Sequence, residues 1–168
     1  MSYILKLLKN NFLLALLSFM KSKNWVNRQK NDQFVKKAKQ LGYINRASFK
    51  LEEIEQKYKI IENSKEILEL GSSPGGWTQV ILNYNPKTNI TCFDILDMKI
   101  NNQRIAFFKE DFLKYNFINL KNKFDLVLSD VAPNTTGHQS TDHLRISQLI
   151  YEVIDRLKIL LKNQGSFI

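Results

Sequence analysis

Four short apolar segments that alternate with helical patterns constrain the fold of this chain more than any other feature. Runs of this length, bounded by glycine or acidic residues, are typical of buried parallel strands joined by crossover helices. The sequence therefore predicts an α/β fold, a doubly wound parallel sheet with helices on both faces, in which the residues after each strand share the carboxyl edge. The predicted strands and the residues that follow them are Glu66–Leu70 with Gly71, Asn89–Phe93 with Asp94, Ile105–Phe108 with Asp111, and Phe124–Ser129 with Asp130.

Helical periodicity surrounds these strands. It predicts helices over 32–39, 47–58 and 77–82, and a long helix from Asp142 to Lys162. We expect Asp142 to cap the long helix and Gly165 to close it, with a fifth strand beginning at Ser166. The apolar stripe predicted to bury the long helix comprises Ile146, Leu149, Ile150, Val153, Leu157 and Leu160.

Positive charge is concentrated at the start of the chain. The 168 residues contain 25 Lys and Arg against 16 Asp and Glu. Residues 1–50 hold nine Lys and two Arg against the single acid Asp32 and carry a net charge of +10, so residues 51–168 carry −1. A near-neutral domain with one strongly basic end is typical of a protein that binds a polyanion, although a Lys- and Asn-rich composition without any partner would give the same count.

The scarcity of cysteine and histidine limits the chemistry. The single Cys92 cannot form an intrachain disulfide, which favours a reducing, cytoplasmic location, and its apolar neighbours place it in the core. One Cys and two His do not supply a structural zinc site, so we expect no metal.

The chain divides into three predicted regions. Residues 1–20 form an apolar extension whose run Phe12–Met20 is too short to span a bilayer. Residues 21–60 form a basic helical segment that we expect to bind RNA, and residues 61–168 form the α/β domain. The role of the extension stays open, and a membrane-associated protein anchored by it is one alternative.

The glycine-rich turn Gly71–Gly76 is the clearest chemical signal. Its glycines let the backbone pass close to a ligand, and the helix that follows presents free N–H groups. It reads Gly-Ser-Ser-Pro-Gly-Gly, which is neither the dinucleotide fingerprint nor a Walker A loop. A tight turn of purely structural importance would use the same residues.

Three separated motifs extend this signal. They are Gly71-x-x-Pro-Gly-Gly-Trp77, Ser129-Asp-Val-Ala-Pro-Asn134, and an N-terminal pattern comprising Ser22–Trp25, Asn45–Lys50 and Leu51–Ile54. In this order and spacing the sequence resembles the FtsJ/RrmJ family of S-adenosylmethionine-dependent RNA 2′-O-methyltransferases, from about Ser22 to Ile168. The resemblance implies a Rossmann-like methyltransferase fold.

The resemblance also implies site residues. It assigns Gly75, Trp77, Asp94, Asp111 and Asp130 to S-adenosylmethionine binding, with Asp94 at the ribose hydroxyls and Asp111 at the adenine amino group. Turn or capping roles are the alternatives for the two strand-end acids, and core packing is the alternative for Trp77. Lys50 and Asp130 match catalytic positions of the family, although composition alone would make Lys50 one more solvated lysine.

The family pattern continues beyond the last residue of this sequence. After Gly165-Ser-Phe-Ile168 the family has a catalytic lysine two residues further on, and then a final glutamate. We therefore expect the domain to lack its C-terminal strands, and the chain as given to have little methyl transfer.

The resemblance implies methylation of a ribose 2′-hydroxyl, that of a uridine, in ribosomal RNA or the large ribosomal subunit. The basic stretch Lys21–Lys50 would contact phosphates, with Trp25, Phe34 and Tyr43 available for stacking. We expect a monomer that is not bound to a membrane. The alternatives are a truncated, inactive remnant that binds only cofactor or RNA, the membrane-associated protein, and a methyltransferase acting on small molecules or proteins.

Overall fold

Five parallel strands form the centre of the computed structural model, which describes residues 32–133 and 135–168. The strands are β1 (Glu66–Leu70), β2 (Asn89–Phe93), β3 (Ile105–Phe108), β4 (Phe124–Ser129) and β5 (Leu161–Phe167). Their order is β3-β2-β1-β4-β5, so the chain reverses its direction of winding between β1 and β4. The first four strands match the predicted ranges, and the predicted α/β fold with a parallel sheet is confirmed.

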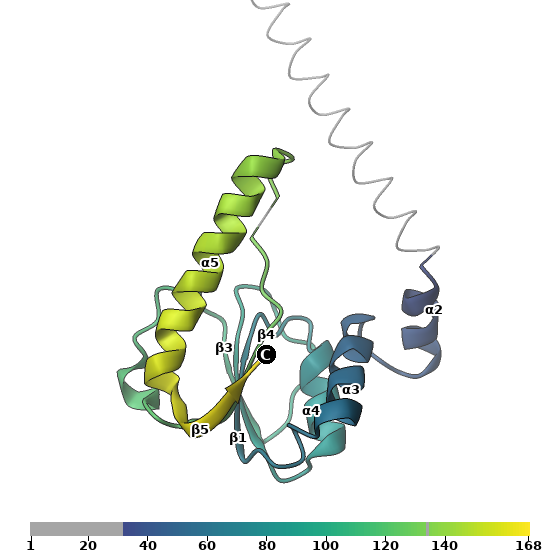
Figure 1. The fold of residues 1–168 in the computed structure, drawn as a ribbon. Helices are drawn as coiled ribbons and strands as arrows, with labels where there is room; N and C mark the ends of the chain where they lie inside the picture. The colour runs from purple at the N-terminus through teal and green to yellow at the C-terminus, as the bar shows by residue number, and fades with distance from the viewer. Residues whose placement is uncertain (1–31, 134) are drawn as a thin grey trace, which may run out of the picture. The chain divides into compact units, whose positions relative to one another are not determined.

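Helices cover both faces of the sheet, as Figure 1 shows. On one side lie α3 (Ala47–Tyr58) and α4 (Gly76–Tyr84), and on the other lies α5 (Gln139–Leu160). A short 3-10 helix, η1 (Phe117–Leu120), precedes β4. The remaining helix, α2 (Gln33–Gln40), belongs to a separate unit that ends at Gly42, and Asp32 caps it by accepting from the Phe34 and Val35 amides.

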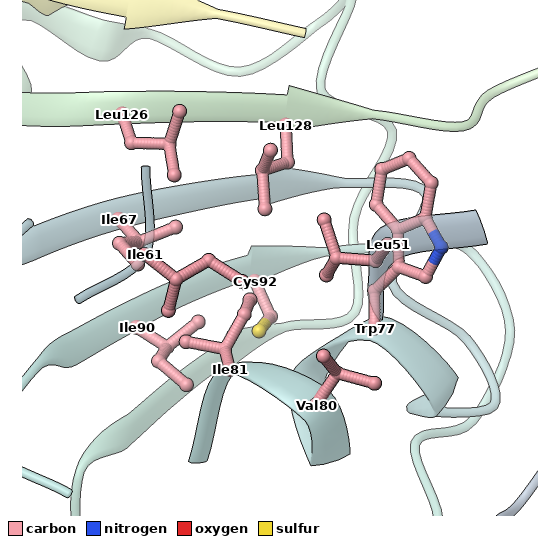
Figure 2. Close-up of a cluster of buried hydrophobic side chains, with 10 residues drawn as sticks. All are labelled: Leu51, Ile61, Ile67, Trp77, Val80, Ile81, Ile90, Cys92, Leu126 and Leu128. Atoms are coloured by element: carbon pink, nitrogen blue, oxygen red, sulfur yellow. The ribbon is translucent and has the colours of Figure 1, made fainter. Parts of the chain in front are cut away.

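Each face of the sheet has its own apolar cluster, because alternate residues of buried strands point to opposite sides. Leu51 of α3 and Trp77, Val80 and Ile81 of α4 pack on one face (Figure 2). Val153, Leu157 and Leu160 of α5 pack on the other face. The strand residues divide accordingly: Ile67, Ile90, Cys92, Leu126 and Leu128 face α3 and α4, and Leu68, Leu70, Phe93, Phe124 and Val127 face α5.

Asp125 joins the amino ends of three strands on the edge opposite the predicted site. Its Oδ2 accepts from the Lys65 and Glu66 amides at 3.0 and 2.9 Å, and its Oδ1 lies 2.8 Å from the Lys162 ammonium. Desolvation raises the pKa of this carboxyl, but the Lys162 hydrogen bond and the two amides outweigh it, and the pKa is lowered overall. No pattern in the sequence indicated these contacts.

The predictions at the ends of α5 were wrong. The N-cap is His138, and Asp142 lies inside the first turn. The Asp142 carboxylate instead reaches back to accept from the Thr136 and Gly137 amides, because it can satisfy the loop from within the helix. Gly165 does not close the helix, which ends at Leu160 and passes directly into β5. Gly165 lies within that strand, at a register shift against β4.

The predicted apolar stripe of α5 is only partly buried. Val153, Leu157 and Leu160 are buried, whereas Ile146 and Ile150 keep 41% and 51% of their surface exposed. The N-terminal half of α5 extends beyond the carboxyl edge of the sheet (Figure 1), and Ile146 and Ile150 line an open pocket with Ser129 at the end of β4 and Phe167 of β5. Among the described residues, no helix is long and apolar enough to cross a bilayer.

Candidate active site at the carboxyl edge

The turn between β1 and α4 holds two residues in the left-handed backbone region. Gly71 has φ +78° and Gly75 has φ +114°, which residues with a Cβ seldom adopt. A Cβ on Gly71 would lie 2.6 Å from Val131 Cγ1, so β1 and the segment after β4 approach closely only because this residue is glycine. The Gly71 and Ser72 amides donate to Phe93 O at 2.9 and 3.3 Å, and these bonds tie the turn to the end of β2.

Asp94, directly after β2, belongs to the same structure. Its Oδ2 accepts from the Ser73 amide and its Oδ1 accepts from the Leu96 amide, both at 2.8 Å. The carboxylate is therefore fixed between the glycine turn and the loop after β2. Each oxygen keeps lone pairs that could accept hydrogen bonds from a ribose diol.

Asp111, three residues beyond β3, adopts the turn role that was the alternative in the sequence. Its Oδ1 accepts from the Leu113 amide at 3.0 Å, and its backbone carbonyl accepts from the Lys114 amide at 2.9 Å. Within the part of the chain that the structure describes, Oδ2 is paired with the Lys114 ammonium, at 3.8 Å. The side chain is 35% exposed, so a second role at the adenine amino group stays a prediction.

Lys50 and Asp130, 80 residues apart in the sequence, meet at this edge. The Lys50 Nζ lies 2.8 Å from Asp130 Oδ1 and 5.4 Å from the centroid of the Trp77 ring. The two side chains are 60% and 42% exposed, and an ion pair this exposed contributes about 0–1 kcal/mol to stability. The pair therefore contributes little to the stability of the fold, and its importance is that it places the Lys50 ammonium beside Asp130.

Trp77 is a core residue as well as a neighbour of Lys50. It is 4% exposed, and its ring packs beside Leu51 in the cluster of Figure 2. The indole Nε1 donates to Ala47 O at 2.8 Å. The packing role considered for Trp77 is thus present, and its contact with the cofactor remains a prediction.

A family model of FtsJ-like methyltransferases matches residues 43–168, which is the unit that contains the whole sheet. The chain belongs to the FtsJ-like methyltransferase family. Curated relatives include "Ribosomal RNA large subunit methyltransferase E" of Zymomonas mobilis, 38% identical in an alignment of 152 residues that covers 88% of this chain and 68% of the relative. The protein of the same name from Rickettsia bellii is 37% identical over 157 residues, covering 88% and 69%.

A solved structure is also similar to this FtsJ-like methyltransferase. It is a ribosomal RNA methyltransferase from Plasmodium falciparum, with a TM-score of 0.66 and 27% identity, and the match covers 74% of this chain and 76% of that one. The Rossmann-like methyltransferase fold expected from the motifs is thereby confirmed.

One acid of this methyltransferase had no role assigned from the sequence. It lies in β1, two residues before the glycine turn. Glu69 of β1 is 2% exposed, and its Oε2 accepts from Thr78 Oγ1 at 2.6 Å and contacts Cys92 Sγ at 3.8 Å. Burial raises the pKa of Glu69 to about 8, against the lowering effect of the Thr78 and Cys92 hydrogen bonds, and the Asp94 charge raises it further. The carboxyl is therefore mostly protonated at pH 7. An acid within an otherwise apolar strand was the available signal.

Cys92 lies in the core, as predicted. It is fully buried, and burial raises the pKa of its thiol well above the ordinary value, so the thiolate needed for reaction is not formed.

Two buried side-chain oxygens near the turn have no hydrogen-bond partner within the described residues. They are Ser72 Oγ in the turn and Asn45 Oδ1, which lies where a Cβ on Gly76 would stand. Buried polar atoms are normally paired, so these two oxygens are exceptions, and Asn45 Oδ1 fills the space beside Gly76. The carboxylates of Asp94 and Asp111 and the Lys50 ammonium at this edge suit a cofactor with hydroxyl, amine and carboxylate groups.

The residues predicted to contact RNA are only partly described. Trp25 and the basic residues before residue 32 lie outside the described residues. Phe34 of α2 is 57% exposed, and Lys36, Lys37 and Lys39 on the same helix are exposed. Tyr43 is half-buried and donates to Glu52 Oε1; burial, followed by this bond, raises its pKa to about 12.

Across 32–133 and 135–168, no group of three or more His, Cys, Asp or Glu converges as metal ligands would. The prediction that the enzyme needs no metal is not tested by this.

Proposed function

We propose that this chain transfers a methyl group from S-adenosylmethionine to a ribose 2′-hydroxyl of large-subunit ribosomal RNA, with uridine as the target nucleoside. The proposal is supported by the family and by the names of the relatives at 38% and 37% identity. The observation that carries it is the pair of Lys50 and Asp130 beside the glycine turn. This pair brings a cation and a carboxylate to the edge where ligands of such sheets bind.

The cofactor would be held by residues from three strand ends. The glycine turn with Gly75 lets the ligand approach the backbone, and Asp94 and Asp111 offer carboxylate acceptors to hydroxyl and amino groups. Trp77 would border the same space from below. Bound S-adenosylmethionine supplies an electrophilic methyl group on a sulfonium.

Lys50 and Asp130 would act on the attacking hydroxyl, whose oxygen gains the methyl group from the sulfonium sulfur and whose proton would be released to water. An ammonium close to a ribose 2′-hydroxyl stabilises the negative charge that develops on its oxygen and lowers its pKa. Asp130 would fix the ammonium, because Oδ1 accepts from Lys50 Nζ at 2.8 Å. Correct alignment of the hydroxyl for in-line displacement would supply much of the remaining rate.

Calorimetry with S-adenosylmethionine tests the cofactor site. Asp94→Ala and Asp111→Ala should each weaken binding by roughly tenfold, since each removes a carboxylate acceptor of charge-assisted strength. Asp97→Ala is the matched control, because Asp97 lies three residues from Asp94 and its side chain is 83% exposed and paired with Lys109, while its contact with Ser73 is made by the backbone carbonyl, which alanine keeps. Equal affinity of all three variants and the parent would remove Asp94 and Asp111 from the site.

A methyl-transfer assay on ribosomal subunits tests the proposed reaction. Given measurable parent turnover, Lys50→Met should lower kcat by about 10²-fold, the lower end for a positioned proton-transfer or charge-stabilising group. The affinity for S-adenosylmethionine should stay close to that of the parent. A parent kcat retained in Lys50→Met would exclude Lys50 from catalysis.

RNA binding should depend on salt and on α2. Replacing Lys36, Lys37 and Lys39 with Gln should reduce the slope of log affinity against log salt by about 0.7–0.9 for each phosphate that the variant no longer neutralises. The control replaces the exposed Lys87, Lys114 and Lys158. If the two triple variants change the slope equally, the RNA surface does not lie on α2.

A further inference from the structure

A frame of hydrogen bonds joins the start of α3 to the first turn of α4. Ile44 N donates to Gln79 Oε1 at 3.0 Å, and Ser48 Oγ donates to Gly76 O at 3.1 Å. The third bond is that of the Trp77 indole with Ala47 O, at 2.8 Å. All three connect residues far apart in the sequence, so they hold α3, and Ile44 three residues before it, against α4 rather than stabilising either helix alone.

Two of the side chains that form this frame are buried. Ser48 is completely buried and Trp77 is 4% exposed. Asn45 Oδ1 lies where a Cβ on Gly76 would stand, so residue 45 rests directly on the backbone of α4. Hydrogen bonds in such surroundings are costly to break, because the freed groups would be buried without partners.

Lys50 stands at the end of this frame. It lies three residues after Ala47, on the same side of α3, and its ammonium reaches both the Trp77 ring and Asp130. Exposed ion pairs favour their closed form by no more than about fivefold, so the contact with Asp130 cannot by itself keep the ammonium in place. The buried contacts of α3 on α4 must therefore determine where Lys50 is presented.

We propose that the first turn of α4 positions the Lys50 ammonium at Asp130, and that Ser48, Trp77 and Gln79 are positioning residues for it. The catalytic importance of this arrangement rests on the proposed function. The arrangement itself does not, since it concerns contacts within the chain. Trp77 then has a second role beside any contact with the cofactor. Its ring lies next to the Lys50 ammonium, and its indole N–H donates to the backbone carbonyl of Ala47.

The test is an NMR measurement on the full chain. Signals of the Lys50 ε-methylene, assigned with Lys50→Arg, should show a nuclear Overhauser effect to the Trp77 ring and an upfield ring-current shift. Gln79→Met removes the acceptor at almost unchanged side-chain length, and Gln79→Glu keeps an acceptor oxygen. Ser48→Ala removes the buried donor. Its matched control is Ser64→Ala, because Ser64 is 5% exposed and its hydroxyl also donates to a backbone carbonyl, that of Ile60.

Gln79→Met and Ser48→Ala should lose most of the effect and of the upfield shift, whereas Gln79→Glu and Ser64→Ala should keep both. With measurable parent turnover, the first two should lower kcat by about fivefold, the factor of one ordinary hydrogen bond, without changing the KM for S-adenosylmethionine. Signals unchanged in folded Gln79→Met would overturn the proposal, even if Ser48→Ala fails to fold. Signals that respond as expected while Lys50→Met keeps full turnover would support the positioning but refute the catalytic role.

Discussion

Replacing Gly71 with alanine should destabilise this protein more than its backbone conformation alone explains. A residue with a Cβ in the left-handed region costs about 1–2 kcal/mol, and loss of unfolded-state freedom offsets about 0.4–1 kcal/mol of that. The new Cβ would also lie 2.6 Å from Val131 Cγ1, well inside van der Waals contact. Overpacking of this kind costs about 1–3 kcal/mol more, since Val131 follows Asp130 directly and cannot move without the backbone of Asp130.

Gly137 provides the control for Gly71. Its φ is +86°, close to the +78° of Gly71, but a Cβ there would meet nothing within 4 Å. Urea denaturation of Gly71→Ala and Gly137→Ala should therefore differ in free energy of unfolding by the contact with Val131, about 1–3 kcal/mol. Adding Val131→Ala to Gly71→Ala should recover most of the difference. If the two glycine variants are equally stable, or the double variant recovers nothing, then the close approach of β1 and the segment after β4 is not what requires glycine.

Two further predictions concern pH. The folded pKa of Glu69 is raised from 4.5 to about 8, so the folded state binds the extra proton and stability should fall as pH rises between these values. Glu69→Gln should remove this loss. In urea titrations from pH 5 to 8, the free energy of unfolding of Glu69→Gln should rise relative to that of the parent by at most about 1.4 kcal/mol per pH unit. A difference between the two free energies that stays constant with pH would mean that Glu69 is ionised in the folded protein. For Asp125 the folded pKa is lowered, so its contribution should be present above its ordinary pKa of 3.8 and lost as pH falls. Asp125→Asn should be less stable than the parent at pH 7, with a gap that narrows in thermal melts as the pH falls below 3.8; a gap that does not narrow would show a cause other than charge.

The sheet could be predicted from the sequence because each of its first four strands is a short apolar run with turn residues at its end. Glu66–Leu70 and Phe124–Ser129 are buried on both faces, and such strands give a signal that does not depend on their neighbours. The carboxyl-edge position of Asp94 and Asp130 followed from strand direction alone.

The ends of α5 could not be predicted in this way. Asp142 has the chemistry of an N-cap, but a carboxylate in the first turn of a helix can accept hydrogen bonds from the amides of the preceding loop equally well. Only the path of the backbone decides which of these two roles the residue takes. Gly165 resembles a helix stop, yet Leu160 and Leu161 already pack in the sheet cluster before the chain reaches it.

The contact between Lys50 and Asp130 also could not be predicted from local sequence patterns, because it depends on tertiary structure. Nothing in the basic segment distinguishes Lys50 from its neighbours, and only the family pattern selected it. The frame that places it uses Ser48 and Gln79, whose side chains have no sequence signature because their partners are backbone groups. Glu69 was visible as an acid in an apolar strand, but its protonation follows from burial that only the packed sheet provides.

The strand order has a consequence for the order in which a ribosome releases this chain. β1 lies in the middle of the sheet, between β2 and β4, but β4 is synthesised only after β2 and β3. Until Phe124–Ser129 emerges, β1 can pair on one side only, with its other edge and the face later covered by α5 both open. Exposed apolar strand edges of this kind promote pairing with other chains. The nascent protein should therefore be most prone to aggregation, and most dependent on chaperones, in the interval between the emergence of β1 and the emergence of β4 from the ribosome.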